Sequence, residues 1–410
     1  MFCLFAEKKP QVSSVSMILS LPPRFEEKDS KPTITVHQNS VCLEDRDTSV
    51  NFHLHNADLS PLSCRGLLLN RHKDLQMTLR SLEAKEDVII QPARQDSAHI
   101  HQSKLVEKIL ICQNQLFCIS CGNRILHRHS SFHRVLPLPS ENWSEYADMW
   151  FCHQHDSHGA SDTHDTTDTH DHPKSNPSRS LTPKANDCLV GTTYIMIKSR
   201  HIQSGAVNSH QDELVCSRCG VCIGTSLTHK QNDQETKDIY KIYLHATAFQ
   251  QTDDVSDLLT SKQSSEDRLQ YFLSQLLQEE SQLYTSFRFI ISSTDNHNLS
   301  IKILVWLLDE NIEVYQGICE TTSNINQVID IPAVLCMKLL YRCILSSSHV
   351  KPEDKAIYKL WERDNSVHGI SLPYSLCRQM TSLLINSTKK LPKSSRQLNG
   401  FNVGLLNVKR

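Results

Sequence analysis

The chain has little glycine, almost no net charge and no long apolar run. It contains 11 glycines in 410 residues, and neither a glycine-rich phosphate loop nor a nucleophile elbow is present. The formal net charge of −2 gives no overall positive field that would hold nucleic acid directly. The longest apolar stretch, near residues 301–308, includes Lys302 and is far too short to span a membrane. Nucleotide-cradling, direct nucleic-acid-binding and membrane-spanning functions are therefore not expected.

Cysteine, by contrast, is plentiful, with 15 residues in the chain. The apolar run within residues 1–9 is too short for a secretory signal. The thiols are therefore expected to stay reduced, in the cytoplasm or also in the nucleus. The eight-ligand array of a RING domain is absent from the sequence, so any metal site must have another form.

Two CxxC pairs are the most specific motif of the chain. They consist of Cys118, Cys121, Cys216 and Cys219, and a glycine follows each pair. Four thiolates on two tight turns are the usual ligand set of a closed structural zinc site. The alternatives are two reduced structural turns or a redox pair, and no strand–helix–strand pattern surrounds either motif to favour redox chemistry. We therefore predict one structural zinc ion shared by the two pairs.

Composition and periodicity divide the chain into four segments. We expect a β-rich domain over residues 1–152, a His/Asp/Thr-rich linker over 153–186, a β region over 187–262 and an α/β region over 263–410. The run 161–172 has no large apolar residue. Because the linker can bury little apolar surface to offset the conformational entropy lost on ordering, it is predicted to be disordered. The predicted fold class is α+β. A zinc site is expected to cross-link the β-rich N-terminal and central part, and the C-terminal half is expected to be mixed α/β.

Hydrophobic periodicity within these segments predicts individual elements. Strands are expected at residues 32–36, 50–54, 75–79, 109–112, 115–119, 193–197, 239–245, 287–291 and 301–308. Helices are expected at residues 264–280, 334–344 and 353–362. The strands at 109–112 and 115–119 are expected to pair as a hairpin, with the first CxxC turn just beyond it.

An aromatic-rich segment lies between the two CxxC pairs. It spans residues 136–153, contains Trp143 and Trp150, and ends in Cys152 and His153. In one interpretation it is a loop that covers the β-rich domain with its aromatic rings buried. In the other, the tryptophans anchor an exposed recognition segment, and Cys152 is a soft ligand for the metal of a partner.

Cys377 is the cysteine of interest near the C-terminus. An apolar helix face is expected beside it, formed by Leu376, Met380, Leu383 and Leu384. Cys377 is then either a small buried thiol or a thioester nucleophile activated by the helix N-terminus or by Arg378. The residue pattern alone leaves both alternatives open.

Taken together, these motifs resemble a known family. The two CxxC pairs, the stretch Leu-Pro-Ser-Glu-Asn-Trp at 138–143 and the stretch Trp-Phe-Cys-His at 150–153 are similar to HECT-like proteins that bind ubiquitin-conjugating enzymes. The resemblance extends from about residue 15 to the end. It implies a ubiquitin-protein ligase that accepts ubiquitin from a conjugating enzyme and transfers it to itself or to substrates. It also implies cyclin B as a partner.

The resemblance also implies roles for two cysteines. Thioester ligases of the HECT class carry a Leu-Pro-x-x-x-Thr-Cys pattern. Leu372, Pro373 and Cys377 match it at a spacing one residue shorter, with Leu376 in place of the threonine, which implies Cys377 as the catalytic residue. Residues 136–160 are similar to a cysteine-bearing segment of a chaperone for metallo-β-lactamase-type RNA endonucleases. In that alternative the protein is a non-enzymatic partner of a pre-mRNA cleavage endonuclease in mRNA 3′-end processing, with Cys152 as a ligand to its zinc.

Overall fold

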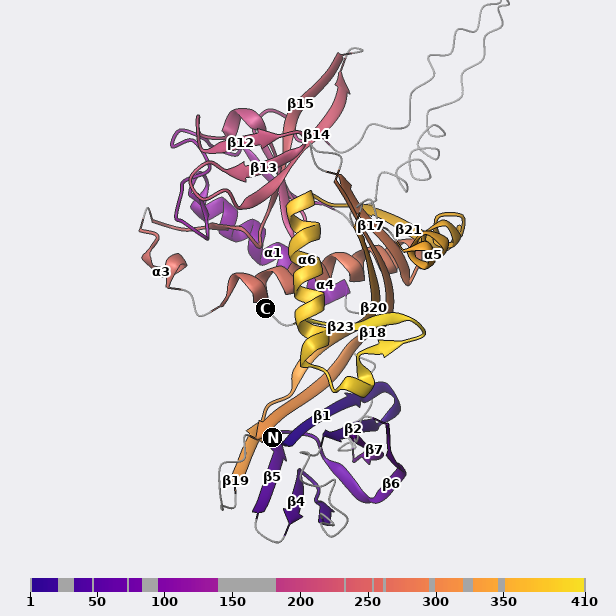
Figure 1. The fold of residues 1–410 in the computed structure, drawn as a ribbon. Helices are drawn as coiled ribbons and strands as arrows, with labels where there is room; N and C mark the ends of the chain where they lie inside the picture. Colours follow the sequence, from indigo (N-terminus) through magenta and orange to yellow (C-terminus); the bar gives the residue numbers. More distant parts are fainter. Residues whose placement is uncertain are drawn as a thin grey trace, which may run out of the picture. The chain divides into compact units, whose positions relative to one another are not determined.

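The structure is a computed structural model in which residues 2–20, 33–45, 48–71, 74–82, 95–138, 182–231, 234–252, 254–260, 263–294, 299–319, 327–345 and 351–408 are described. The chain forms two compact units (Figure 1). Unit 1 combines residues 1–93 with 263–410, and unit 2 consists of residues 94–262. These units group residues that contact one another in space. The four segments expected from composition divide the chain by sequence position, and they stay a prediction.

A large, mainly antiparallel sheet organises unit 1. Its strands are β1 (Phe2–Lys9), β2 (Ser14–Ser20), β6 (Leu59–Leu69), β7 (Asp74–Ser81), β17 (Arg288–Thr294), β18 (Ser300–Cys319), β20 (Val334–Leu345), β21 (Val367–Ser371), β22 (Gln397–Leu398) and β23 (Phe401–Asn407). The order is β22-β23-β20-β18-β1-β2-β7-β6, and β17 joins β18 to β21. Phe2 of β1 lies opposite Cys319 of β18. Segments from both ends of the chain therefore share one sheet.

A second sheet of unit 1 has the order β19-β5-β4-β3. Its strands are β3 (Thr33–Val36), β4 (Ser40–Asp45), β5 (Thr48–Leu54) and β19 (Gln327–Ile331). Successive side chains of a strand point to opposite faces, and one face of this sheet is buried. Its buried residues include Val41, Leu43, Val50, Phe52 and Leu54. They pack with Leu4 and Met17 of the large sheet in one apolar core.

Three helices of unit 1 are α4 (Ser265–Tyr284), α5 (Pro352–Glu362) and α6 (Tyr374–Lys390). A capping box begins α4, because the Ser264 hydroxyl accepts a hydrogen bond from the backbone N–H of Asp267 at 3.0 Å. Proline occupies the first position of α5, where its missing N–H is not needed. The helices predicted at 264–280 and 353–362 and the apolar face of α6 are confirmed.

The helix predicted at residues 334–344 is wrong, because this segment is strand β20. Its backbone pairs with β18 on one side and with β23 on the other. Apolar side chains on both faces of such a central strand are buried, and the resulting short apolar run has no clear period of two. The sequence pattern of this segment fits a helix or a buried strand, and pairing with strands on both sides makes it a strand.

Unit 2 is built on a seven-stranded sheet of order β12-β13-β14-β15-β11-β10-β9. The strands are β9 (Arg134–Pro137), β10 (Asp187–Val190), β11 (Tyr194–Lys198), β12 (Val207–His210), β13 (Glu213–Cys216), β14 (Cys222–Gln231) and β15 (Gln234–Tyr243). A separate pair joins β8 (Leu116–Cys118) to β16 (Thr247–Phe249). The unit also holds α1 (Gln95–Cys112) and the single turn α3 (Ser256–Leu259), and its apolar core includes Ile109, Leu116, Ile195 and Ile242.

The hairpin predicted over residues 109–119 is also wrong. Residues 109–112 are the last turn of α1, and β8 pairs with β16 instead. Ile109 and Cys112 are buried, whereas Leu110 and Ile111 are exposed. This is the three-residue spacing of a helix face, which a run of only four apolar residues could not reveal.

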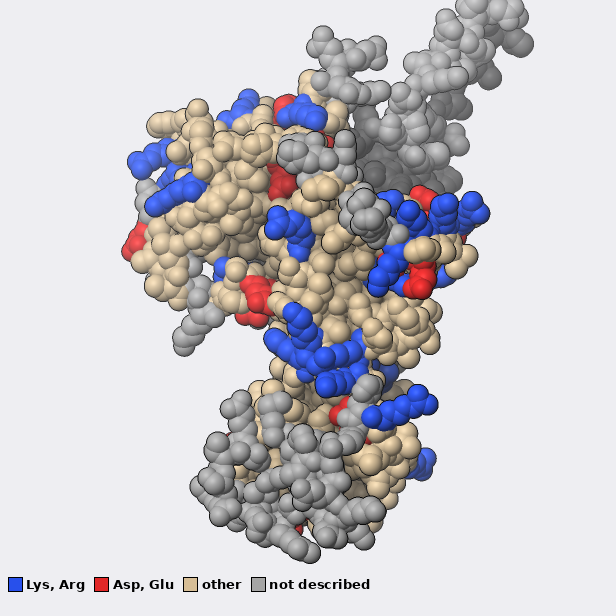
Figure 2. All heavy atoms as spheres, viewed as in Figure 1, with Lys and Arg blue, Asp and Glu red and all other residues tan. Residues whose placement is uncertain are grey.

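Charged groups of both signs are spread over the face of the molecule shown in Figure 2, and Lys and Arg side chains gather near the end of α6. Lys389 and Lys390 lie in the last turn of that helix, where positive charge complements the partial negative charge of the helix C-terminus. None of the described helices is long and apolar enough to cross a membrane.

Candidate metal centre

The two CxxC pairs of unit 2 lie on matching turns, each at the end of a short strand. Cys118 ends β8 and Cys216 ends β13. In the first turn the Gly122 N–H donates to the Cys118 carbonyl at 2.8 Å, and in the second the Gly220 N–H donates to the Cys216 carbonyl at 2.8 Å. Both glycines have positive φ, +70° and +73°, a conformation that glycine adopts without strain. This explains the glycine after each pair.

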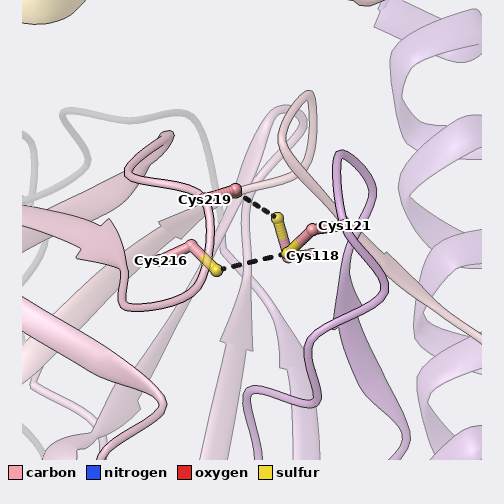
Figure 3. Close-up of side chains that lie close together, drawn as sticks. All are labelled: Cys118, Cys121, Cys216 and Cys219. Atoms are coloured by element: carbon pink, nitrogen blue, oxygen red, sulfur yellow. Dashed lines mark hydrogen bonds between the residues drawn. The ribbon is translucent and has the colours of Figure 1, made fainter.

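The turns bring the four thiols together (Figure 3). The Cys118 and Cys219 sulfurs lie 3.7 Å apart, and the Cys121 and Cys216 sulfurs lie 3.6 Å apart. All four ligand atoms lie within 4.8 Å of one another. A tetrahedral zinc site with Zn–S bonds of about 2.3 Å has sulfur–sulfur edges of about 3.8 Å. The predicted four-cysteine cluster is confirmed, and its donor set and size fit a metal ion.

Two polar side chains support this cluster from outside. The Asn123 side-chain amide donates to the Cys216 sulfur at 3.5 Å and to the Ala206 carbonyl at 3.1 Å. The Arg218 guanidinium donates to the Cys121 carbonyl at 3.1 Å. The hydrogen bond from Asn123 reaches a sulfur, and such bonds orient ligand atoms and offset the negative charge of thiolates. The bond from Arg218 instead links the second turn to the backbone of the first. Sequence reasoning missed Asn123, although its place directly after the first CxxC-Gly was the available signal.

Burial and hydrogen bonding act differently on the thiols. Burial raises the pKa of Cys118 well above its usual value, and it raises the pKa of Cys121 to about 11. Burial also disfavours the thiolate of Cys216. Hydrogen bonds from backbone N–H groups of its own turn and from Asn123 outweigh that effect and lower the pKa of Cys216 to about 7. Because metal-bound cysteines are thiolates, the binding of a metal ion here would displace protons.

Cys377 lies in unit 1, near the start of α6, and its side chain is fully buried. Leu376, Met380 and Leu384 are buried beside it on the predicted apolar helix face. The Cys377 sulfur lies 3.8 Å from the Leu372 carbonyl oxygen, to which the thiol donates. Its surroundings are those of a packed helix, and its role as a nucleophile stays a prediction.

The predicted partner-binding residues Trp143, Trp150, Cys152 and His153 lie outside the described residues. Most of the predicted linker also lies outside them, and its last residues, 182–186, are described. The metal-clamp role of Cys152 and the nuclease partnership therefore stay predictions, as does the disorder of the linker.

Fold and site together define an α+β protein with a four-cysteine cluster in one of its two units, and the donor set and size of this cluster fit a metal ion. The family model for HECT-like Ubiquitin-conjugating enzyme (E2)-binding proteins matches residues 7–403, and the chain belongs to this family. The predicted resemblance is thereby confirmed.

Relatives align along almost the whole chain. An E3 ubiquitin-protein ligase of Homo sapiens is 24% identical, over 99% of this chain and 98% of its own length. The protein of the same name from Mus musculus is 25% identical, again over 99% and 98%. Uncharacterized protein YJR141W of Saccharomyces cerevisiae is 26% identical over 26% of this chain and 27% of its own. No solved structure matches the chain.

Proposed function

We propose that the chain is a ubiquitin-protein ligase that binds a ubiquitin-loaded conjugating enzyme and promotes transfer of ubiquitin to itself or to a substrate. The observation that carries this proposal is the family match over residues 7–403. Two relatives named as ubiquitin-protein ligases, aligned along 99% of the chain, support it. The conjugating enzyme and ubiquitin are then its partners. Cyclin B stays a prediction, because none of the matched names refers to it.

In this proposal the four-cysteine cluster holds zinc in a structural role. Four sulfur ligands fill a tetrahedral zinc, so no position is left for a substrate or an attacking water. The ion would hold the β8 turn against the β13 turn inside unit 2, where the first and second cysteine pairs lie. Zinc would therefore stabilise the unit without taking part in ubiquitin transfer.

Two routes of transfer are compatible with a ligase of this kind. In a relay, the Cys377 thiolate attacks the thioester carbonyl of the loaded enzyme, the conjugating enzyme's thiol leaves, and a lysine amine then attacks the new thioester. In direct transfer, the lysine attacks the conjugating enzyme's thioester itself. A relay needs an accessible thiol, and the Cys377 side chain is fully buried.

Exposing Cys377 would require part of α6 to leave the core. Leu376, Met380 and Leu384 are fully buried beside it, and burial of each such side chain stabilises the fold by about 1.5–3 kcal/mol. We therefore favour direct transfer, with the conjugating enzyme's cysteine as the only thioester. Lysines at the end of α6, such as Lys389 and Lys390, are candidate acceptors in self-modification.

A discharge assay tests the proposal and separates the two routes. The full chain is mixed with conjugating enzyme loaded with ubiquitin, and loss of the loaded form is followed without reducing agent. Cys377→Ala removes the relay thiol. Cys64→Ala is the matched control, because Cys64 is an exposed cysteine on β6, outside the four-cysteine cluster.

Direct transfer predicts that both variants speed discharge as well as the wild type does. A relay predicts a ubiquitin adduct that reducing agent cleaves and that Cys377→Ala abolishes, whereas Cys64→Ala keeps it. If the wild-type chain does not speed discharge with any member of a panel of conjugating enzymes, the ligase proposal itself is wrong.

A further inference from the structure

A second group of metal-binding side chains lies on the open face of the small sheet in unit 1. Strands β5 and β19 lie side by side (Figure 1) and run parallel, and the register makes His53 of β5 the partner of Asp330 of β19. Phe52 and Leu54 of β5 are buried in the core. The alternation of side chains along a strand therefore places His53 on the opposite, solvent-facing side. His55 is the first residue after β5, and its backbone N–H donates to the Ile331 carbonyl of β19 at 3.1 Å, so it continues the pairing of the two strands.

The three side chains converge on one carboxylate oxygen. His53 Nδ1 lies 3.0 Å from Asp330 Oδ1, and His55 Nε2 lies 3.7 Å from the same oxygen. The centroids of the two imidazole rings are 4.9 Å apart, and the ring planes are nearly perpendicular, at 79°. One ligand atom from each residue lies within 4.8 Å of the others. In a tetrahedral zinc site with bonds near 2.05 Å, ligand atoms are about 3.3 Å apart, so small rotamer changes would close this group around an ion.

A fourth residue orients the first histidine. The Asn39 side-chain amide lies 3.0 Å from His53 Nε2, the ring nitrogen that does not face Asp330. Histidine ligands usually bond through their second nitrogen to such a partner, which fixes the ring and its tautomer. When Nδ1 ligates a metal, Nε2 carries the proton, and this N–H would donate a hydrogen bond to the Asn39 amide oxygen after a flip of the amide.

We propose that His53, His55 and Asp330 form a second metal site, which binds zinc or a similar divalent transition ion. Two imidazoles and one carboxylate suit such ions better than magnesium or calcium, which prefer all-oxygen ligands. Three protein ligands leave one position of a tetrahedral ion for water or another ligand. The side chains are 32%, 49% and 68% exposed, so an ion reaches them without unfolding.

Metal binding at this place would join two distant parts of the chain. His53 and Asp330 are 277 residues apart in sequence, and β19 is an edge strand, held on one side by β5. An ion shared between the two strands would strengthen that edge. This role is separate from ubiquitin transfer and from the four-cysteine cluster, which lies in the other unit.

Equilibrium dialysis of the full chain, with its four-cysteine cluster saturated by one equivalent of zinc, tests the site. The chain has 22 histidines, so the measurement is the difference in further zinc bound by matched variants. The test variant is His53→Ala/His55→Ala. The control is His127→Ala/His129→Ala, which removes a histidine pair with rings 5.5 Å apart that belongs to neither described group of candidate metal ligands.

The test variant should lose one equivalent of further zinc, and the control should keep it. Asn39→Ala should keep the site but lower its zinc affinity by about 10–100-fold, the effect usual for a residue that orients a metal ligand. If the double variant does not fold, Asp330→Asn removes the anionic ligand with little change of size and should also lose the equivalent. Further zinc binding that is unchanged in these variants, or reduced equally in the control, would overturn the proposal.

Discussion

The two matching turns of the cysteine cluster allow a controlled substitution at their glycines. Gly122 and Gly220 have nearly the same φ, +70° and +73°, so alanine at either position meets the same backbone strain. Their surroundings differ. A Cβ at Gly220 would have no neighbour within 4 Å, whereas a Cβ at Gly122 would lie 2.8 Å from the Val255 Cγ2 atom.

These distances give the expected magnitudes. An L-residue in the left-handed region costs about 1–2 kcal/mol, so Gly220→Ala should destabilise unit 2 by that amount. Gly122→Ala should cost the same plus the displacement of Val255. Val255 is β-branched and stiff, and moving its side chain off a rotamer costs about 0.5–1.5 kcal/mol. The total for Gly122→Ala is therefore about 1.5–3.5 kcal/mol.

Release of the proposed zinc ion during unfolding provides the assay. The full chain is titrated with denaturant at a fixed zinc concentration, and a chromogenic chelator reports the ion that leaves the cluster. A loss of one or two kcal/mol changes the folded-to-unfolded ratio by about 5–30-fold. Gly122→Ala should also be made in a Val255→Ala background, where the clash is removed. The loss of stability that it causes there, measured against Val255→Ala alone, should equal the loss caused by Gly220→Ala in the wild type.

The reasoning would be refuted by a larger effect at Gly220 than at Gly122. It would also be refuted if Val255→Ala failed to reduce the cost of Gly122→Ala, because the extra term would then not come from that contact. Equal and negligible effects of both substitutions would mean that neither glycine needs its left-handed conformation.

Three further outcomes follow from the structure and the sequence. Zinc binding at about pH 8 should release at least two protons per ion in a weakly buffered titration, because burial raises the pKa of both Cys118 and Cys121; release of fewer would mean that the thiols are already ionised. Deleting residues 155–180 should leave the melting temperature nearly unchanged, since that stretch has few apolar side chains to bury, and a fall of many degrees would show that it packs on the fold. The hydrogen bond from Arg134 holds the pKa of Asp187 below its ordinary value, so their pairing stabilises unit 2 above the unfolded-state pKa of about 3.9 and is lost as pH falls through the lower folded-state pKa. Arg134→Ala should therefore be less stable than wild type at neutral pH, with a difference in acid unfolding that shrinks below about pH 4, and a difference independent of pH would show that charge is not its cause.

Both CxxC pairs could be predicted from residue types and spacing to form one four-cysteine cluster. Each pair has the residue types and spacing of a metal-binding turn, with a glycine that lets the backbone close, whereas the approach of the two pairs, 95 residues apart, was settled by the fold. The face of α6 was predictable for a similar reason, because Leu376, Met380 and Leu384 repeat at helical spacing. The first turn of α4 carried its own signal in the capping residue Ser264.

What the sequence determined by itself was therefore local: the two CxxC turns, the amphipathic helices and the α+β class. The tertiary structure decided everything that depends on a distant partner. It paired Phe2 with Cys319, made residues 334–345 a central strand, buried Cys377 and set His53 beside Asp330. Strand pairing and burial depend on two segments at once, so they cannot be inferred from the sequence of either segment alone.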